Sequence, residues 1–296
     1  MMSTKEDAVV FSSQGEDLLG ILHKPPQHSD IGVLVVVGGP QYRIGSHRHF
    51  VLLARYLAAR GVPVFRFDYR GMGDSGGEMP GFENINSDIS SAIDVFTASS
   101  PGLSRVVIWG LCDAASAALL YAHMDQRVAG LVLLNPWVRT EQGLARTYLR
   151  HYYLKRLFSR DFWAKLGSGK WNARESLSSL LEMVAKLSGR QNVDVGEDPG
   201  EAAINVNFLS RMVEGMEQFT GPILFILSLR NDYVADEFRG MVAGSGRFRR
   251  LMNTAQVTVR ELEGANHTFS KQEWRDMVAH WTYEWFTLKL IDNAQK

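Results

Sequence analysis

The chain has 296 residues, of which 45% are hydrophobic and 22% are charged, as in ordinary water-soluble globular proteins. Its 32 Lys and Arg residues balance its 32 Asp and Glu residues, so it lacks the basic excess typical of nucleic-acid-binding proteins. A single cysteine excludes an internal disulfide, and the longest apolar runs are too short to span a bilayer. The N-terminal sequence also lacks the basic and apolar regions of a signal peptide. We therefore expect a cytoplasmic protein with no nucleic-acid partner and no transmembrane segment.

Short apolar runs alternate with helical segments through the first half of the chain. Two runs on either side of "SSQGED" predict a β-hairpin. Further strands are predicted over 31–40, 62–68, 105–110 and 128–136. Helices are predicted between them, over 46–60, over 83–98 and after residue 112. This alternation requires crossover connections, and so it predicts a mostly parallel sheet with helices on both faces.

The middle of the chain departs from this alternation. Residues 140–166 and 173–187 have helical patterns, 188–203 read as a polar loop, and no strand is evident. We predict a helical cap or lid over 139–218, inserted into a core formed by 1–138 and 219–296. The basic and aromatic run at 150–160 is either a solvated helix face or a docking surface for the phosphate of coenzyme A (CoA), an acidic carrier protein or anionic lipid.

After the predicted cap, strands are expected over 221–228 and 256–262. A final helix is predicted to begin at a capping box formed by Ser270 and Glu273. Its apolar face carries Trp274, Met277, Val278, Trp281 and Trp285.

The only cysteine, Cys112, lies where a predicted strand ends and a helix begins, in "GLCDA". This matches the nucleophile elbow G-x-S-x-G with Cys in place of Ser and Ala in place of the last Gly. Such a tight turn tolerates only small residues two positions before and after the nucleophile, and it places the thiol at a helix N-terminus. The alternative is a buried cysteine that only fills space in the core.

Two further residues complete a candidate Cys-His-Asp triad. At an elbow of this kind the nucleophile is followed along the chain by an acid and then by a histidine, each after a late strand. Asp232 follows the predicted strand 221–228, with Asp236 as a second choice, and His267 follows the strand 256–262. In this arrangement His267 activates Cys112 and Asp232 orients the imidazole.

Several sequence motifs resemble those of known protein families. "FDYRGMGDSGG" and "EGANHTF" resemble two loops of α/β-hydrolases, in which we expect Asp68 and Arg70 to hold the first loop's shape. "GGPQYRIGSHRHF", "GLCDAASAALLYA" and "YYLKRLFSRDFW" resemble the exosortase A system-associated hydrolase 1 family. The resemblance covers nearly the whole chain, and it implies an α/β-hydrolase fold with hydrolase activity in a setting of exopolysaccharide and protein-sorting functions.

An oxyanion formed during acyl transfer needs two backbone donors. One is expected from Asp113, the residue after the nucleophile, and the other from the loop after strand 31–40. Since Pro40 has no N–H, the second donor is Gln41 or Gly39, of which we choose Gln41.

A cysteine nucleophile favours activated acyl donors, because exchange of one thioester for another is nearly isoenergetic. We expect hydrolysis of an acyl ester or thioester through an acyl-enzyme, without a cofactor. The alternative is an acyltransferase that uses the same residues to pass an acyl group from CoA or an acyl-carrier protein to an alcohol or amine.

Two residues near the same loop are candidates for substrate binding. Arg43 can bind an anionic group or form an ion pair, and His47 can line a pocket. His47 and His49 have H-x-H spacing, but no third ligand is evident, so no metal site is predicted.

Overall fold

The computed structural model describes residues 5–39, 41–138 and 199–292. The chain divides into two compact units, residues 1–138 with 209–296, and residues 139–208. Most of the predicted cap lies outside the described residues, so the cap stays a prediction. Its described end forms helix α7, Pro199–Gln218, which starts inside the segment predicted as a polar loop. Proline is favoured at the first helical position because the missing N–H has no helical partner there.

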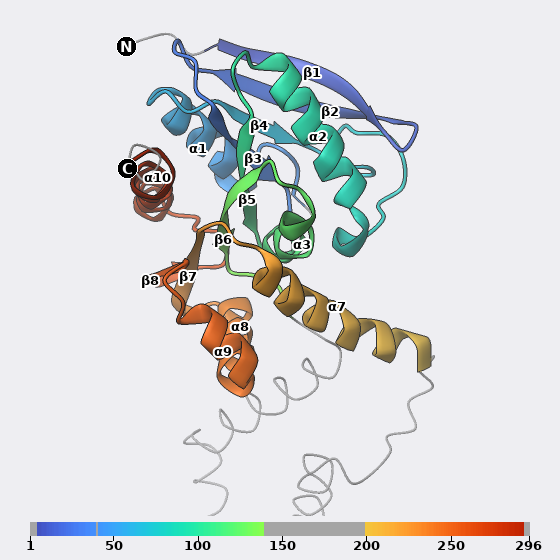
Figure 1. The fold of residues 1–296 in the computed structure, drawn as a ribbon, viewed down its shortest axis with the longest axis vertical. Helices are drawn as coiled ribbons and strands as arrows, with labels where there is room; N and C mark the ends of the chain where they lie inside the picture. Colours follow the sequence, from blue (N-terminus) through green and yellow to red (C-terminus); the bar gives the residue numbers. More distant parts are fainter. Residues whose placement is uncertain (1–4, 40, 139–198, 293–296) are drawn as a thin grey trace, which may run out of the picture. The chain divides into compact units, whose positions relative to one another are not determined.

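A sheet of eight strands organises the described part of the chain (Figure 1). The strand order is β1-β2-β4-β3-β5-β6-β7-β8; β1, β2 and β4 pair antiparallel, and the other neighbours pair parallel. The strands are β1 Lys5–Ser13, β2 Glu16–Lys24, β3 Ile31–Val36, β4 Val64–Phe67, β5 Arg105–Leu111, β6 Val128–Leu134, β7 Ile223–Asn231 and β8 Val257–Asn266. The predicted hairpin and the predicted mostly parallel sheet are both confirmed.

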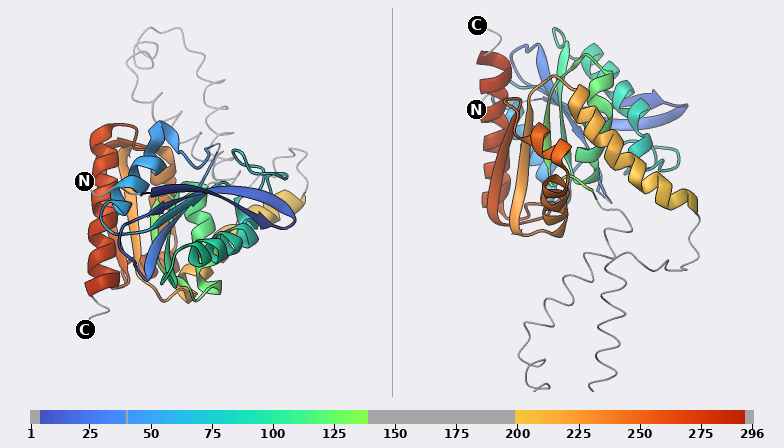
Figure 2. Two further views of the ribbon diagram at one scale, coloured as in Figure 1. Left: turned by 90° about the horizontal axis from the view of Figure 1, so that it is seen from above. Right: turned by 60° about the horizontal axis from the view of Figure 1, so that its bottom comes forward.

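Helices cover both faces of this sheet. Helix α1 (His49–Ala58) and helix α10 (Gln272–Phe286) pack together on one face. Helix α2 (Asn86–Ser99) and helix α3 (Asp113–Tyr121) lie on the other face (Figures 1 and 2). The strands at the centre of this sandwich are largely apolar because both of their faces are buried. Every residue of β3 and β4 is buried, including Arg66, the one charged residue of these two strands.

The start of α10 differs from the prediction. The helix begins at Gln272 after Lys271, and Ser270 does not cap it. Instead, the side chain of Asn266 holds Ser270: Asn266 Nδ2 donates to Ser270 Oγ at 2.8 Å, and Ser270 N donates to Asn266 Oδ1 at 3.0 Å. The capping-box prediction is therefore wrong, because the serine hydroxyl is used by the loop that precedes the helix.

Two helices follow β7 that the sequence pattern did not predict, α8 (Tyr233–Gly244) and α9 (Gly246–Met252). Each starts at a side-chain cap. Asp232 Oδ1 accepts from Val234 N at 3.0 Å, and Ser245 Oγ accepts from Phe248 N at 3.2 Å. Both caps satisfy amide groups that would otherwise lack a partner in the first helical turn.

None of the helices in the described segments is both long enough and apolar enough to cross a lipid bilayer.

Candidate active site

Cys112 lies in a sharp turn between β5 and α3. Its backbone has φ 65° and ψ −127°, a conformation that costs an L-residue about 1–3 kcal/mol. Two hydrogen bonds fix the turn: Cys112 N donates to Leu134 O at 2.9 Å, and Trp137 N donates to Cys112 O at 3.2 Å. The side chain is largely covered, with 9% of the residue exposed. This is the elbow geometry that the sequence predicted.

The small residues around the elbow have a steric reason. A Cβ on Gly110 would lie 2.7 Å from the carbonyl carbon and oxygen of Ala114. Ala114 itself is fully buried. A larger side chain at either position would therefore push the start of α3 away from the end of β5.

His267 and Asp232 form a hydrogen-bonded pair. Nδ1 of His267 lies 2.9 Å from Oδ2 of Asp232, and the side chain of Asp232 is only 3% exposed. A carboxylate only accepts hydrogen bonds, so this contact favours the tautomer of His267 in which Nδ1 is the donor and Nε2 is the acceptor. The second oxygen of Asp232 is held by the α8 cap already described, which fixes the orientation of the carboxylate.

Asp236, the second choice for the acid, is placed differently. It lies on the first turn of α8, where its Oδ1 accepts from Arg239 Nη2 at 2.6 Å and 46% of its side chain is exposed. The structure thus pairs His267 with Asp232.

A buried amide connects the elbow to the histidine loop. Asn135, which follows β6 directly, donates from Nδ2 to His267 O at 3.0 Å and to Ser228 Oγ at 2.9 Å, and its Oδ1 accepts from Ser228 N at 2.8 Å. Ser228 Oγ in turn donates to Asn266 O at 3.0 Å. Since Leu134, the neighbour of Asn135, accepts from Cys112 N, one network joins the ends of β5, β6, β7 and β8.

Asn135 and Ser228 were not predicted as site residues. The signal available in the sequence was a polar residue at the end of an otherwise apolar strand, in "LVLLNP" and in "ILFILS". A buried polar side chain needs a partner, so such residues mark a place where another loop arrives.

The predicted oxyanion donors lie on two segments that contact each other. The carboxylate of Asp113 reaches from the start of α3 to the loop after β3, where Oδ1 accepts from Gly39 N at 2.6 Å. The same oxygen accepts from Ala114 N at 2.9 Å. Gln41 Oε1 accepts from Ser46 N at 3.0 Å, which orders the later part of this loop. Pro40 lies outside the described residues.

The electrostatic surroundings of Asp113 are mixed. Burial raises the pKa of its carboxyl, while the hydrogen bonds from Gly39 and Ala114 and the proximity of His267 act in the opposite direction. The net direction is upward, so the carboxyl next to Cys112 holds its proton more readily than an exposed aspartate does.

Arg43 is engaged by two acidic side chains. Its Nη1 contacts Asp68, its Nη2 donates to Asp74 Oδ2 at 2.5 Å, and its side chain is 13% exposed. The backbone N–H of Arg43 also donates to Asp68 Oδ1 at 2.5 Å. Of the two roles that the sequence left open, the structure shows the ion pair, and substrate binding by Arg43 stays a prediction.

The loop that contains Asp68 and Arg70 is held as predicted. Ser75 Oγ donates to Asp68 O at 2.7 Å, and Arg70 Nε donates to the buried carboxylate of Asp88 at 2.8 Å. These two residues therefore stabilise the shape of the loop.

His47 and His49 do not converge on a common point. His47 is exposed with a φ of 55°, whereas His49 is buried against the rings of Trp109 and Phe269. Within the described ranges, no three His, Cys, Asp or Glu side chains are grouped closely enough to hold a metal ion.

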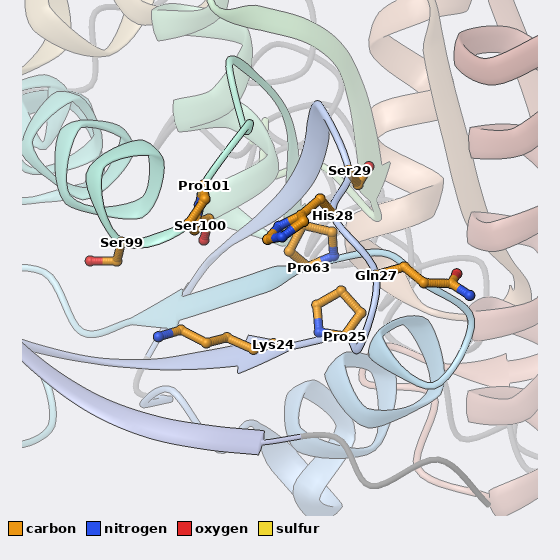
Figure 3. Close-up of a pocket in the computed structure, with 9 residues that line it drawn as sticks. All are labelled: Lys24, Pro25, Gln27, His28, Ser29, Pro63, Ser99, Ser100 and Pro101. Atoms are coloured by element: carbon orange, nitrogen blue, oxygen red, sulfur yellow. The ribbon is translucent and has the colours of Figure 1, made fainter.

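A shallow cavity lies away from these residues, near the amino ends of β3 and β4 (Figure 3). Its lining consists of Lys24, Pro25, Gln27, His28, Ser29, Pro63, Ser99, Ser100 and Pro101. The candidate residues lie instead at the carboxyl ends of the parallel strands, where ligands bind in open α/β sheets.

The sheet order, the crossover helices and the elbow together define an α/β-hydrolase fold. The chain matches the family described as Hydrolase_4, serine aminopeptidase S33, over residues 30–272, and it belongs to this family. The family description specifies a serine, whereas the elbow of this chain carries Cys112. No curated protein sequence matches the chain.

Solved structures share the fold at low sequence identity. An esterase from Pyrococcus furiosus aligns with a TM-score of 0.63 and 15% identity, covering 97% of this chain and 92% of the esterase. Est1E from Butyrivibrio proteoclasticus, solved with bound ferulic acid, aligns with a TM-score of 0.63 and 15% identity, covering 96% and 99%. The α/β-hydrolase GrgF from Penicillium sp. sh18 has a TM-score of 0.62 and 15% identity over 97% and 99%.

Proposed function

We propose that this α/β-hydrolase cleaves an acyl ester or thioester with Cys112 as nucleophile, His267 as general base and acid, and Asp232 as the orienting acid. The observation that carries the proposal is the 2.9 Å hydrogen bond between His267 and a buried Asp232, on the same edge of the sheet as the cysteine elbow. The esterases among the solved structures of this fold add support for ester substrates.

The proposed reaction has two steps. His267 Nε2 takes the proton of the Cys112 thiol, the sulfur attacks the acyl carbonyl carbon, and the leaving alcohol or thiol departs with the proton from His267. Water then gives a proton to His267, attacks the acyl-thioester carbon and releases the carboxylic acid, while the proton returns to the sulfur. Backbone N–H groups of Asp113 and Gln41 stabilise the oxyanion in both steps.

The finer assignments are part of the same proposal. A thioester donor such as an acyl-CoA or an acyl-carrier protein suits a sulfur nucleophile, because the first step then exchanges one thioester for another. We also propose membership in the exosortase A system-associated hydrolase 1 group, a cytoplasmic location in which the single cysteine stays reduced, and a helical cap over 139–218.

Turnover of p-nitrophenyl esters and acyl-CoAs by Cys112 variants tests the proposal. Cys112→Ala is expected to abolish turnover with an unchanged thermal unfolding midpoint. Cys112→Ser is expected to lower the rate with thioesters more than the rate with oxygen esters. Unchanged turnover by Cys112→Ala would remove the cysteine from the reaction.

A product analysis with alcohols and amines present separates hydrolysis from acyl transfer. The proposal predicts that free acid forms at the same rate with and without these acceptors. Acylated alcohol or amine as the main product would instead identify an acyltransferase that uses the same residues.

A further inference from the structure

The side chain of Asp113 joins the elbow to the loop after β3. Its Oδ1 accepts hydrogen bonds from Gly39 N at 2.6 Å and from Ala114 N at 2.9 Å. The first bond crosses between segments 74 residues apart in the sequence, whereas the second is local to the start of α3. One carboxylate oxygen therefore ties the loop that follows β3 to the residue that follows the nucleophile.

The two glycines of this loop fit that arrangement in different ways. A Cβ on Gly38 would lie 2.3 Å from Asp113 Oδ1 and 2.4 Å from Leu111 O, so the loop backbone packs directly on the elbow. Gly39 has open space around it, but its φ is +60°, which is unfavourable for other residues. Gly38 thus allows the close approach, and Gly39 allows the turn that aims its N–H at the carboxylate.

The hydrogen bond also decides which amide of the loop is available to substrate. Gly39 N–H donates to Asp113 and is not available to an oxyanion. Pro40 has no N–H, so Gln41 is the next residue along the loop with a backbone donor. We propose that Asp113 is a positioning residue whose carboxylate anchors Gly39 and thereby fixes the loop so that Gln41 N–H is its oxyanion donor. This inference rests on the proposed acyl hydrolysis at Cys112.

The hydrogen bond that anchors Gly39 requires an acceptor oxygen at residue 113, but it does not require a negative charge there. A negative charge beside Cys112 disfavours both a thiolate and an oxyanion. An asparagine amide oxygen accepts the same hydrogen bond from Gly39 without that charge. The two roles of the side chain, anchoring and charge, can therefore be separated by comparing alanine with asparagine at this position.

The test compares Asp113→Ala, Asp113→Asn and a control, Asp276→Ala, which removes an exposed aspartate on α10. With the best ester substrate, Asp113→Ala is expected to lower kcat by about 100-fold, the effect of losing one oxyanion donor, while KM changes by less than about 3-fold. Asp113→Asn is expected to recover most of this loss and to shift the acidic limb of the pH–rate profile to lower pH. The rate of Cys112 alkylation by iodoacetamide reports the thiol separately, and we expect it not to fall in either variant.

Hydrogen exchange of the Gly39 amide, followed by NMR on the full-length chain, tests the anchor without any substrate. Exchange is expected to accelerate in Asp113→Ala and to stay slow in Asp113→Asn and Asp276→Ala. Unchanged protection of Gly39 or unchanged kcat in Asp113→Ala would overturn the inference, and so would an Asp113→Asn variant as impaired as Asp113→Ala. If the wild-type chain turns over no acyl substrate, the proposed function fails, whereas the exchange measurement still decides whether the anchor exists.

Discussion

Cys112 combines a strained backbone with a nearly covered side chain, and both follow from its place in the turn. A positive φ at this residue lets the chain reverse from β5 into α3 within one residue. The cost of about 1–3 kcal/mol is offset by the hydrogen bonds of the turn to Leu134 in β6 and to Trp137, and by the burial of Leu111 and Ala114. The same turn makes Cys112 the N-cap residue of α3, and the free amide groups of a first helical turn favour negative charge.

The carboxylate that orients His267 can be tested by a single pair of variants. Asp232→Asn is expected to lower kcat by about 10³–10⁴-fold, because the amide no longer selects the tautomer with the proton on Nδ1. Asp236→Asn removes a charge of the same type four residues further along α8, and it should keep activity within about 3-fold. Steady-state kinetics on both variants checks this. A large loss in Asp236→Asn with full activity in Asp232→Asn would mean that the wrong acid has been chosen.

Single residues also mark the limit of what the sequence could predict. Cys112, Asp232 and His267 each follow a recognisable strand, so their order and their place at strand ends could be predicted from local pattern. The cross-connections of Asn135 and of the Asp113 side chain could not be predicted, because they depend on which loops lie next to each other in space. The ion pairs of Arg43 could not be predicted for the same reason, since its two acidic partners, Asp68 and Asp74, come from a different loop.

At the scale of elements, four parallel strands contribute their carboxyl ends to one network centred on Asn135. This amide is buried and makes three hydrogen bonds, which join the loop after β6 to Ser228 in β7 and to the loop after β8. The bond from Asn135 Nδ2 to His267 O joins the loop that carries His267 to the end of β6. The position of this loop relative to the elbow should therefore depend on Asn135, together with the bonds from His267 to Asp232 and from Ser228 to Asn266.

Asn135→Ala is expected to lower the free energy of unfolding by about 1–3 kcal/mol, because it leaves buried polar groups without partners. It should also lower kcat by at least about 10-fold, since the backbone of His267 loses its donor. Urea denaturation and kinetics measure the two effects. Asn84→Ala, at an exposed asparagine that donates to Pro80 O, should change neither quantity appreciably. A fully active Asn135→Ala variant would contradict the role given to the network.

The close contact between the loop after β3 and the elbow leads to a prediction about stability. Gly38→Ala is expected to destabilise the protein by more than about 1 kcal/mol, because the added methyl group meets Asp113 and the backbone of Leu111. Gly240→Ala, inside α8 with no atom within 4 Å of the added Cβ, should stabilise it by about 0.5–1 kcal/mol. Thermal unfolding of the two variants should thus move in opposite directions. A neutral Gly38→Ala would show that the two segments are less tightly packed.

Strands and helices could be predicted where the apolar pattern lies within the element itself. The strands of the parallel sheet and the helices between them have clear apolar periodicity, and so the fold class could be predicted from the sequence. The start of α10 could not, because Ser270 is held by Asn266 across a loop instead of by the helix. The apolar pattern does not predict helices α8 and α9, whose starts are set by the side-chain caps Asp232 and Ser245.

For the whole molecule, two buried histidines couple stability to pH. Burial lowers the pKa of His49 to about 3 and, with Arg66 nearby, the pKa of His23 to about 4. Arg66 Nε donates to His23 Nε2 at 2.8 Å, which requires that nitrogen to be unprotonated. The unfolded chain, with histidine pKa values near 6.5, binds more protons than the folded chain below that pH. Both histidines therefore contribute stability that is present above about pH 6.5 and is lost as pH falls towards 4 and 3.

We expect the free energy of unfolding to fall by about 2 kcal/mol for each of these histidines between pH 7.5 and about pH 5. His49→Phe, which keeps an aromatic ring against Trp109, should reduce this pH dependence by about half. An exposed counterpart, His47→Phe, should leave it unchanged. Urea denaturation at the two pH values measures the effect. The same slope in His49→Phe and in the wild type would mean that His49 does not stay neutral in the folded protein.

The most direct measurement is intact-protein mass spectrometry on enzyme quenched in acid within milliseconds of mixing with an acyl-CoA or a p-nitrophenyl ester. A covalent intermediate at the elbow predicts a mass increase of one acyl group, located on the peptide that contains Cys112, removed by neutral hydroxylamine and absent in Cys112→Ala. Acylation of any other residue, or sustained turnover by Cys112→Ala, would contradict a cysteine-based mechanism.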